Sequence, residues 1–400
     1  MKRILFVDDD QNVLDGLQNL LRRQRQQWDM VFTLGAHAAL EELQKGASFD
    51  VVVSDMRMPG MDGAELLQRV KDEFPSTTRI VLSGHAEREA IARALPVAHQ
   101  FLSKPCDAAV LRDVIGRTCD VNALINDATI RQVVGKIDKL PSAPRTYWEL
   151  TQAIANPDVS VYDLATIVER DPAMSVKVLQ LVNSAYFGLA QRVTSIQQAV
   201  KYLGVELLKG LALTAHVFAI RLPKIDGFSV TRIQESSLLT ARLCRSFLSA
   251  PKLAEEAFTA ALVHDIGRIV IAAALPKQLA AVLRTARETG EELHVIERDL
   301  LGVSHAEIGA YLLGVWGLPF AIVEAVAHHH SPRRVTGGAR DVLAALHVAD
   351  ALADTVCGGA AESPGESKLD LDFLEEAGLT HHLPRWTALA LSTRNGGERS

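Results

Sequence analysis

Hydrophobic and polar residues follow two different patterns along the chain, and the first covers the amino-terminal part. Five short apolar segments lie near residues 2–7, 29–33, 50–54, 79–83 and 100–102. Between them, helical stretches separate one apolar segment from the next. Short apolar strands that alternate with helices are typical of a parallel sheet flanked by helices. We therefore expect an α/β domain over residues 1–120, with a five-stranded, doubly wound parallel sheet.

The second pattern begins after residue 135 and shows no alternation of strands. Helical spacing continues to about residue 352, and Asn-Pro, Asp-Pro and Leu-Gly pairs divide it into helices. This pattern predicts an all-α domain over residues 136–354, long enough to form its own hydrophobic core. The tail, residues 355–400, opens with the Gly-rich, acidic stretch GGAAESPGES and ends in a polar run. We expect it to be partly disordered, with a short helix at LDFLEEAG.

The junction between the two domains carries a pattern of its own. Asp107 can cap a helix whose apolar positions continue at alternating spacings of three and four through Ala128. One interpretation is a long helix over residues 107–134, with residues 121–135 as a linker helix that pairs with its twin in a homodimer. Gly116 and Asn122 weaken such a coiled coil. The other interpretation is a last helix that packs on its own sheet, followed by a plain linker.

Composition narrows the class of partner and the compartment. The 400 residues are 48% hydrophobic and 22% charged, and the net charge of −6 leaves no broad basic face, so nucleic acid is not an expected partner. No run approaches 18 apolar residues, so we expect no membrane span. The four cysteines have neither metal nor disulfide spacing, which fits a reducing compartment. We expect a cytoplasmic protein.

Polar residues follow the apolar strands of the first domain where each strand ends. The acids Asp8 and Asp9 follow KRILFV, Asp55 follows VVVS, Ser83 ends RIVLS, and Lys104 follows QFLS. Carboxyl ends of parallel strands meet at one edge of a sheet. Three acids in one cleft need a cation, and oxygen ligands favour Mg²⁺. A carboxylate bound to Mg²⁺ can attack a phosphoryl group, while Lys104 and the Ser83 hydroxyl can bind the phosphoryl oxygens.

These residues resemble the receiver domain of two-component response regulators, over residues 1 to about 120. The resemblance implies Asp55 as the phosphoacceptor, and Asp8, Asp9, Asp55 and the backbone carbonyl of Arg57 as the Mg²⁺ site. It casts Phe101 as the aromatic residue that rotates inward on activation. It also implies a phosphoryl donor, either a sensor histidine kinase or a phosphotransfer protein.

The all-α part resembles the HDOD domain, over residues of about 130–354. The motifs that carry this resemblance are LPSAPRTYWEL, VERDPAMSVKVLQLVNSAYFG, SIQQAVKYLG and LVHDIGRIV. HDOD domains are relatives of the HD-superfamily metal-dependent phosphohydrolases. The residues at positions that match metal ligands of those enzymes are His264, Asp265, His305, His329, His330 and Asp350. His347 lies one helical turn before Asp350 and is expected to be a neighbour of this site or a further ligand.

One departure decides how we interpret this site. Ser236 stands where HD enzymes carry a further histidine, and a neutral hydroxyl is a poor ligand beside imidazole. The segment after His330 also lacks the extended signature of cyclic-di-GMP phosphodiesterases. We therefore expect a degenerate site that binds a transition metal weakly at most, in a non-enzymatic signalling or scaffold domain with an unidentified protein partner. The alternative is a phosphorylation-regulated metal-dependent phosphohydrolase that acts on a nucleotide or cyclic dinucleotide.

Overall fold

The structure, a computed structural model, forms two compact units, and each is described by itself. The first comprises Met1–Lys139 with Gln180–Arg192 and Gly314–Gly317, and the second comprises the rest. The description leaves out residues 47, 85–93, 95–96, 105, 107, 125–130, 132–133, 136–148, 151, 155, 157–158, 184–191, 214–221, 336–339, 357–367 and 397–400.

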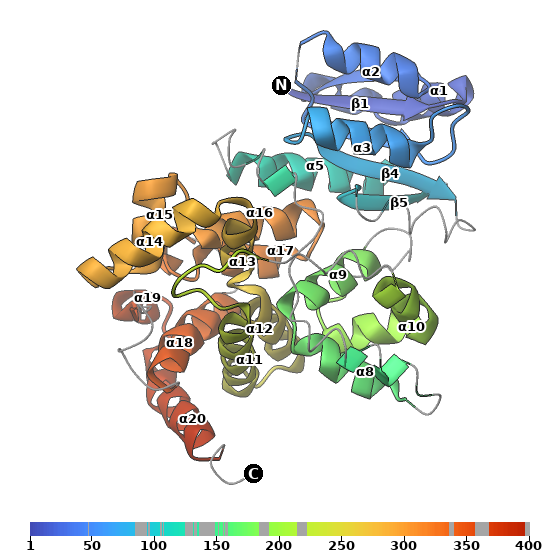
Figure 1. Cartoon of the computed structure of the whole chain (residues 1–400). Helices are drawn as coiled ribbons and strands as arrows, with labels where there is room; N and C mark the ends of the chain where they lie inside the picture. The colour runs from blue at the N-terminus through green and yellow to red at the C-terminus, as the bar shows by residue number, and fades with distance from the viewer. Residues whose placement is uncertain are drawn as a thin grey trace. The chain divides into compact units, whose positions relative to one another are not determined.

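A five-stranded parallel sheet forms the centre of the first unit (Figure 1). Its strands are β1 (Lys2–Asp8), β2 (Trp28–Leu34), β3 (Val51–Asp55), β4 (Thr78–Gly84) and β5 (Gln100–Lys104). The order in the sheet is β2-β1-β3-β4-β5, and every neighbouring pair is parallel. The predicted α/β class is therefore confirmed. Because the strand order reverses beside β1, a crevice is expected at the carboxyl ends of β1 and β3.

Helices cover both faces of this sheet and bury its apolar residues in two clusters. The helices are α1 (Gln11–Leu20), α2 (Ala36–Gln44), α3 (Gly63–Glu73) and α5 (Ala108–Leu124). One cluster joins the sheet to α2 and α3, and the other joins it to α1 and α5. Asp10 and Asp62 begin α1 and α3, where their carboxylates accept backbone N–H groups that the helix leaves free.

The segment that follows the sheet domain contacts the amino-terminal end of β4 through Gly135. Helix α5 ends at Leu124, and residues 125–130 lie outside the described part, so the predicted helix over residues 107–134 is not described throughout. The carbonyl of Gly135 accepts a hydrogen bond of 2.9 Å from Nη2 of Arg79, which is 1% exposed. A Cβ at Gly135 would overlap the carbonyl oxygen of Pro75. This close approach requires glycine.

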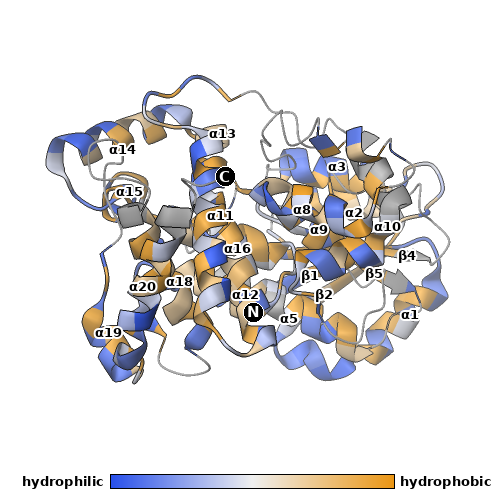
Figure 2. Ribbon diagram, turned by 90° about the horizontal axis from the view of Figure 1, so that it is seen from below, coloured by the Kyte–Doolittle hydropathy of each residue, from blue (hydrophilic) through white to orange (hydrophobic). Residues whose placement is uncertain are grey.

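The described residues of the second unit are helical, as the sequence predicts. Its helices are α8 (Val161–Glu169), α9 (Pro172–Val182), α10 (Ile196–Leu213), α11 (Val230–Phe247), α12 (Pro251–Val263), α13 (Ile266–Ala274), α14 (Pro276–Thr289), α15 (Leu293–Leu301), α16 (His305–Val315), α17 (Phe320–His328), α18 (Asp341–Val356), α19 (Leu371–Glu376) and α20 (Leu383–Gly396). Helices α9 and α16 each continue by a few residues into the segments grouped with the first unit. Hydrophobic residues, orange in Figure 2, run along α12, whereas α14 shows both hydrophobic and hydrophilic residues. Helix α11 packs against α12 and α18.

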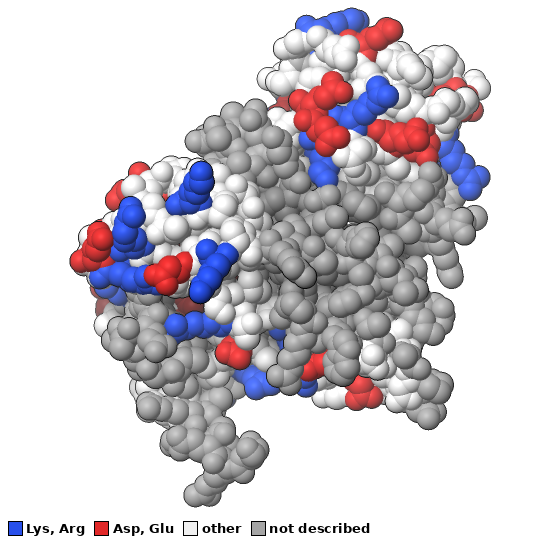
Figure 3. Space-filling view, viewed as in Figure 1, with Lys and Arg blue, Asp and Glu red and all other residues white. Residues whose placement is uncertain are grey.

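Two surface properties bear on the expected partners. On the face seen in Figure 3, Lys and Arg are interspersed with Asp and Glu over the surface that the figure colours. In the described part of the chain, one helical stretch, Pro251–Ala274, has the length and hydropathy of a membrane span. Of its most apolar window, 83% is buried inside the protein, which is the position of a core helix.

The tail contains the predicted short helix and a second helix that the sequence did not predict. Helix α19 coincides with the LDFLEEAG segment and α20 follows it, while residues 357–367 and 397–400 lie outside the described part, so the expected partial disorder stays a prediction. Phe373 and Trp386 of these helices are almost fully buried, and Trp386 stacks on Phe247 of α11 with ring centroids 5.0 Å apart. The indole N–H of Trp386 also donates to the carbonyl of Phe247. A few large side chains thus fix this segment although its flanks are polar.

Candidate functional site

The carboxyl ends of three strands bring two acids and a lysine together in the first unit. Asp8 ends β1, Asp55 ends β3 and Lys104 ends β5. Nζ of Lys104 lies 2.7 Å from Oδ2 of Asp8 and forms a second ion pair with Oδ1 of Asp55. Both carboxylates are nearly buried, while the lysine side chain remains 29% exposed. The ammonium group of Lys104 therefore bridges the two carboxylates, at the edge of the sheet where the strand order predicts a crevice.

The chain around Asp55 holds its carboxylate in one orientation. The backbone N–H of Arg57 donates to Oδ2 at 2.7 Å. Glycine is required at Gly63, since a Cβ there would overlap the carbonyl oxygen of Asp55. Burial raises the pKa of Asp55, and Asp8 adds to this, although Lys104 opposes it. Burial alone would lower the pKa of Lys104, but the two carboxylates outweigh it and raise that pKa. The lysine therefore stays charged between its two partners.

The other residues predicted for this site are placed less closely. Asp9 follows β1 and is exposed, and the Arg57 side chain is exposed too. The side chain of Ser83 lies outside the described residues. Phe101 is 1% exposed within the apolar cluster beside α3. Its side chain is thus already buried, whereas an inward rotation on activation requires an outward conformation beforehand. The oxygen donors of Asp8 and Asp55, already gathered around one cation, suit Mg²⁺.

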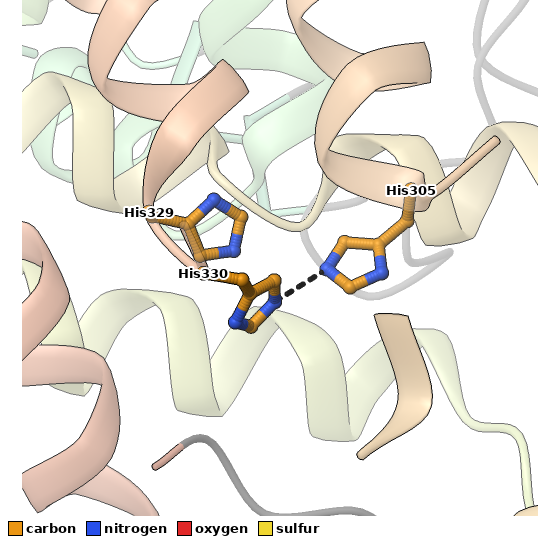
Figure 4. Close-up of side chains that lie close together, drawn as sticks. All are labelled: His305, His329 and His330. Atoms are coloured by element: carbon orange, nitrogen blue, oxygen red, sulfur yellow. Dashed lines mark hydrogen bonds between the residues drawn. The ribbon is translucent and has the colours of Figure 1, made fainter. Parts of the chain in front are cut away.

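A second cluster of ionisable side chains lies in the helical unit, where several helices begin or end. His264 follows α12, Asp265 precedes α13, His305 begins α16, and His329 follows α17. His330 comes next, and Asp350 reaches the cluster from α18. The structure thus brings together all six residues that the sequence singled out, which we call the His/Asp cluster. Figure 4 shows three of its imidazoles pointing toward one another.

Two carboxylates hold one side of the His/Asp cluster. Nε2 of His264 lies 3.1 Å from Oδ1 of Asp350, and its Nδ1 lies 2.6 Å from the carbonyl oxygen of Ala261. Asp265 receives a hydrogen bond of 2.7 Å from Arg268. The other oxygen of Asp265 lies 3.3 Å from Nε2 of His305. The acids of the cluster are therefore paired with cationic or polar groups.

His329 presents a lone pair to the interior. Its Nδ1 donates to the carbonyl of Val326 at 2.7 Å, which leaves Nε2 as an acceptor. This Nε2 is buried and has no hydrogen-bond partner in the described part of the chain. Two groups of donor atoms, each within 4.8 Å of one another, include it: His305, His329 and His330, and His264, Asp265 and His329. A buried imidazole nitrogen without a partner beside an acid is a fitting donor for a transition metal.

The protonation states favour this role for His329 and oppose it for His264. Burial alone would lower the pKa of His264, but Asp265 and Asp350 outweigh it and raise the pKa to about 9. Burial, together with His264, lowers the pKa of His329 to about 3. Burial opposes ionisation of Asp350, yet His264 lowers the pKa of that carboxyl to about 2. At neutral pH the cluster therefore offers ionised carboxylates and an uncharged His329, whereas His264 is protonated and would have to release its proton before it could bind a metal.

Two further residues support the cluster; the sequence missed one of them and left two roles open for the other. Glu297 of α15 is fully buried, and its Oε2 accepts from the backbone N–H of His305 at 2.7 Å and lies 2.6 Å from that residue's Nδ1. An acid on the apolar face of a helix is the only signal that could have found it. His347 was expected as a ligand or neighbour. Both of its nitrogens are engaged by backbone groups, so it is a neighbour that supports the cluster.

The predicted replacement of a ligand by Ser236 is not settled by the geometry. Ser236 lies half-buried on α11, and its carbonyl accepts a hydrogen bond from Thr240. The next residue, Ser237, is fully buried, and its hydroxyl has no partner among the residues described. The role of Ser236 therefore stays a prediction.

Comparison with known proteins divides the chain in the same way. The family model of the response regulator receiver domain matches residues 4–116, and that of the HDOD domain matches residues 140–332. An uncharacterized protein of Treponema pallidum is 28% identical over 56% of this chain and 44% of its own length. The uncharacterized transcriptional regulatory protein YesN of Bacillus subtilis is 36% identical over 27% of this chain and 29% of its own length.

One solved structure shows the fold alone. The crystal structure of a virulence factor of Campylobacter jejuni is 21% identical and covers 68% of this chain and all of its own, with a TM-score of 0.53. The chain spans less than half the length of each of these two curated relatives. Because one family model covers the parallel sheet with its acidic crevice and the other covers most of the helical unit, the chain belongs to the response regulators that join a receiver domain to an HDOD domain.

Proposed function

We propose that Asp55 accepts a phosphoryl group from a sensor histidine kinase or phosphotransfer protein, and that this changes the affinity of the HDOD domain for a protein partner. In this proposal the HDOD domain is not an enzyme. The observation that carries it is the position of Lys104, paired with both Asp8 and Asp55 at one crevice. In this arrangement Lys104 can pair with the Asp55 carboxylate before phosphorylation and with the phosphoryl group afterwards.

The chemistry follows from the positions of these side chains. Oδ1 of Asp55, once released from Lys104, forms a bond to phosphorus. The phosphorus–nitrogen bond of the donor breaks, and its electron pair stays on the donor nitrogen, which takes up a proton. The carboxylates of Asp8, Asp9 and Asp55 and the carbonyl of Arg57 would hold Mg²⁺, which supplies positive charge to the phosphoryl oxygens. Lys104 then pairs with one of those oxygens. Since Lys104 ends β5, its movement reaches the strand that carries Phe101.

The test is phosphorylation by a small donor, acetyl phosphate, followed by intact mass. Wild type with Mg²⁺ is expected to gain one phosphoryl group, and Asp55→Asn none. Asp62→Asn is the matched control, because it alters an acid of the same loop while asparagine still caps α3. Labelling of Asp55→Asn, or labelling that continues after Mg²⁺ is chelated, would reject the assignment.

A second candidate function is that of an HD-type metal-dependent phosphohydrolase. The observation that favours it is the buried Nε2 of His329, without a partner and close to Asp265. The His/Asp cluster would hold the metal, which when bound supplies an activated water for attack on phosphorus. The residues around it would do the rest, with Arg268 holding Asp265 ionised and Glu297 orienting His305. The substrate class would be a nucleotide or a cyclic dinucleotide.

Metal content and turnover distinguish the two candidates. Protein purified without chelator is analysed for transition metals, and hydrolysis of a bis-aryl phosphodiester is measured with added Mn²⁺. The first proposal expects no turnover above that of Asp265→Ala, whether or not the cluster binds an ion. Turnover that depends on Asp265, with one metal per chain, would favour the hydrolase.

A further inference from the structure

The short helix α19, in the tail after the HDOD domain, is held to that domain by an arginine that lies close in sequence to the His/Asp cluster. Arg333 donates to both oxygens of Asp370, at 2.8 and 2.9 Å, and to Asp372 at 2.6 Å. Asp370 caps α19 by accepting from the backbone N–H of Phe373. Phe373 is fully buried. The segment Asp370–Glu376, which we call the α19 clasp, is therefore docked by both charge and apolar burial.

His347 connects the α19 clasp to the cluster. The backbone N–H of Asp370 donates to Nε2 of His347 at 2.8 Å. Nδ1 of the same ring donates to the carbonyl of His329 at 2.7 Å. The Phe373 ring lies edge-on to the His347 ring, with centroids 6.2 Å apart. One imidazole therefore links the first residue of the clasp to the residue that presents the unpartnered nitrogen.

We propose that docking of the α19 clasp holds His329 in place through His347, so that metal binding at the His/Asp cluster and docking of the clasp strengthen each other. This rests on the metal site of the second candidate function. The two effects are equal by thermodynamic necessity, since a clasp that favours the bound metal is favoured by it to the same extent.

The hydrogen bonds give the direction of the coupling. With Asp370 in place, Nε2 of His347 must be the acceptor, so the ring proton stays on Nδ1 and binds the carbonyl of His329. When the clasp leaves, Nε2 loses its donor and the proton can move to that nitrogen. The carbonyl of His329 then loses its partner, while the hydrogen bond from Nδ1 of His329 to Val326 still orients the ring. Groups that orient a ligand in this way typically change metal affinity by about 10–100-fold.

The experiment compares two substitutions at one position in the full chain. Asp370→Ala removes the carboxylate and keeps the backbone N–H, whereas Asp370→Pro removes both. The φ of −86° at this position lies near the range of proline. Co²⁺ is titrated and followed by its visible absorption, and the part of the signal lost in His329→Ala reports the cluster. We expect Asp370→Pro to bind Co²⁺ about tenfold more weakly than Asp370→Ala. Equal affinities would reject the coupling.

A second measurement needs no metal. Hydrogen exchange of the α19 amides is followed in chelator for wild type, for His347→Phe, and for Arg287→Gln. Phenylalanine keeps the ring and removes both hydrogen bonds, and we expect about tenfold faster exchange of the clasp. Arg287 instead pairs with Asp226 in the same domain, and this pair includes no residue of the clasp, so exchange there should match wild type. Unchanged exchange in His347→Phe overturns the proposal even where Co²⁺ binds. If wild type shows no His329-dependent Co²⁺ signal but hydrogen exchange changes as expected, the metal site is rejected, while the link between the clasp and His347 stands.

Discussion

The acidic crevice of the receiver domain and the His/Asp cluster of the HDOD domain hold their charges in different surroundings. In the crevice, one partly exposed lysine neutralises two carboxylates, and its flexible stem can follow them. In the cluster, imidazoles are held by a hydrogen bond at Nδ1, to Glu297 for His305 and to the carbonyl of Val326 for His329. The arrangement in the receiver crevice suits a reversible change of charge, such as phosphorylation and dephosphorylation. The arrangement in the cluster suits a geometry that has to persist.

The largest effect is expected where the rigid arrangement is broken. Glu297→Ala leaves the N–H groups of His305 without their acceptor in a fully buried position. Removing one partner of such a buried pair costs about 3–5 kcal/mol. Urea unfolding followed by circular dichroism measures this loss. Glu288→Ala, at an exposed position on α14, serves as the control and should change the free energy of unfolding by less than about 0.5 kcal/mol. A loss of similar size in both variants would contradict the structural role of Glu297.

A smaller loss is expected where the backbone approaches closely below the crevice. In Gly63→Ala the new Cβ would overlap the carbonyl oxygen of Asp55, so α3 or the loop after β3 has to shift. Overpacking of this kind costs about 1–3 kcal/mol. Gly16→Ala on α1 is the matched control, because its Cβ meets no atom within 4 Å and alanine favours the helix. Unfolding of the two variants should therefore shift in opposite directions, and a shift in the same direction would count against the close approach.

The crevice differs from the cluster in that an added cation should restore the stability that is lost when its lysine is removed. Lys104→Met leaves Asp8 and Asp55 facing each other without their shared partner. We expect the receiver domain to lose about 1 kcal/mol in chelator, because the two carboxyls are only partly screened by water. Added Mg²⁺ should restore most of this loss, since it replaces the missing charge. Thermal unfolding with and without Mg²⁺ measures it. A loss that Mg²⁺ leaves unchanged would mean that the lysine stem, rather than its charge, stabilises the crevice.

The most gradual effect is the pH dependence of the metal-free HDOD domain. The pKa of His264 is raised from 6.5 to about 9, so its stabilising contribution is complete below pH 6.5 and disappears as the pH rises toward 9. The pKa of His329 is lowered from 6.5 to about 3, so stability falls as the pH drops below 6.5. Urea unfolding in chelator should therefore show a maximum near pH 6.5–7. His264→Gln should flatten the alkaline side, and an unaltered alkaline side would contradict the assignment to His264.

Much of the receiver domain could be predicted from the sequence, because strand ends fix the positions of the residues that follow them. Asp8, Asp55 and Lys104 lie together for the simple reason that parallel strands end at one edge. The contact of Gly135 with Arg79 could not be predicted. A charged residue near the start of a strand is usually taken to face solvent, and only the structure shows the Arg79 side chain buried among backbone carbonyls.

The HDOD domain shows where prediction from motifs stops. The motifs point to the six residues of the His/Asp cluster, but Glu297 and Asp370 belong to no motif. Glu297 contacts His305 directly through the packing of α15, and Asp370 is linked to the cluster through His347 by the packing of α19. Packing depends on how whole helices fit, which a local pattern does not contain. The same holds for the tail, where the single residue Trp386 fixes a helix whose neighbours read as polar.

The central claim is that phosphorylation of Asp55 changes the state of the HDOD domain. It is tested most directly by hydrogen exchange of α16, α17 and α18 in the full chain, with and without acetyl phosphate and Mg²⁺, alongside Asp55→Asn. We predict that exchange in at least one of these helices changes in wild type and stays the same in Asp55→Asn. Identical exchange in wild type before and after phosphorylation, with the added phosphoryl group verified by intact mass, would contradict the claim.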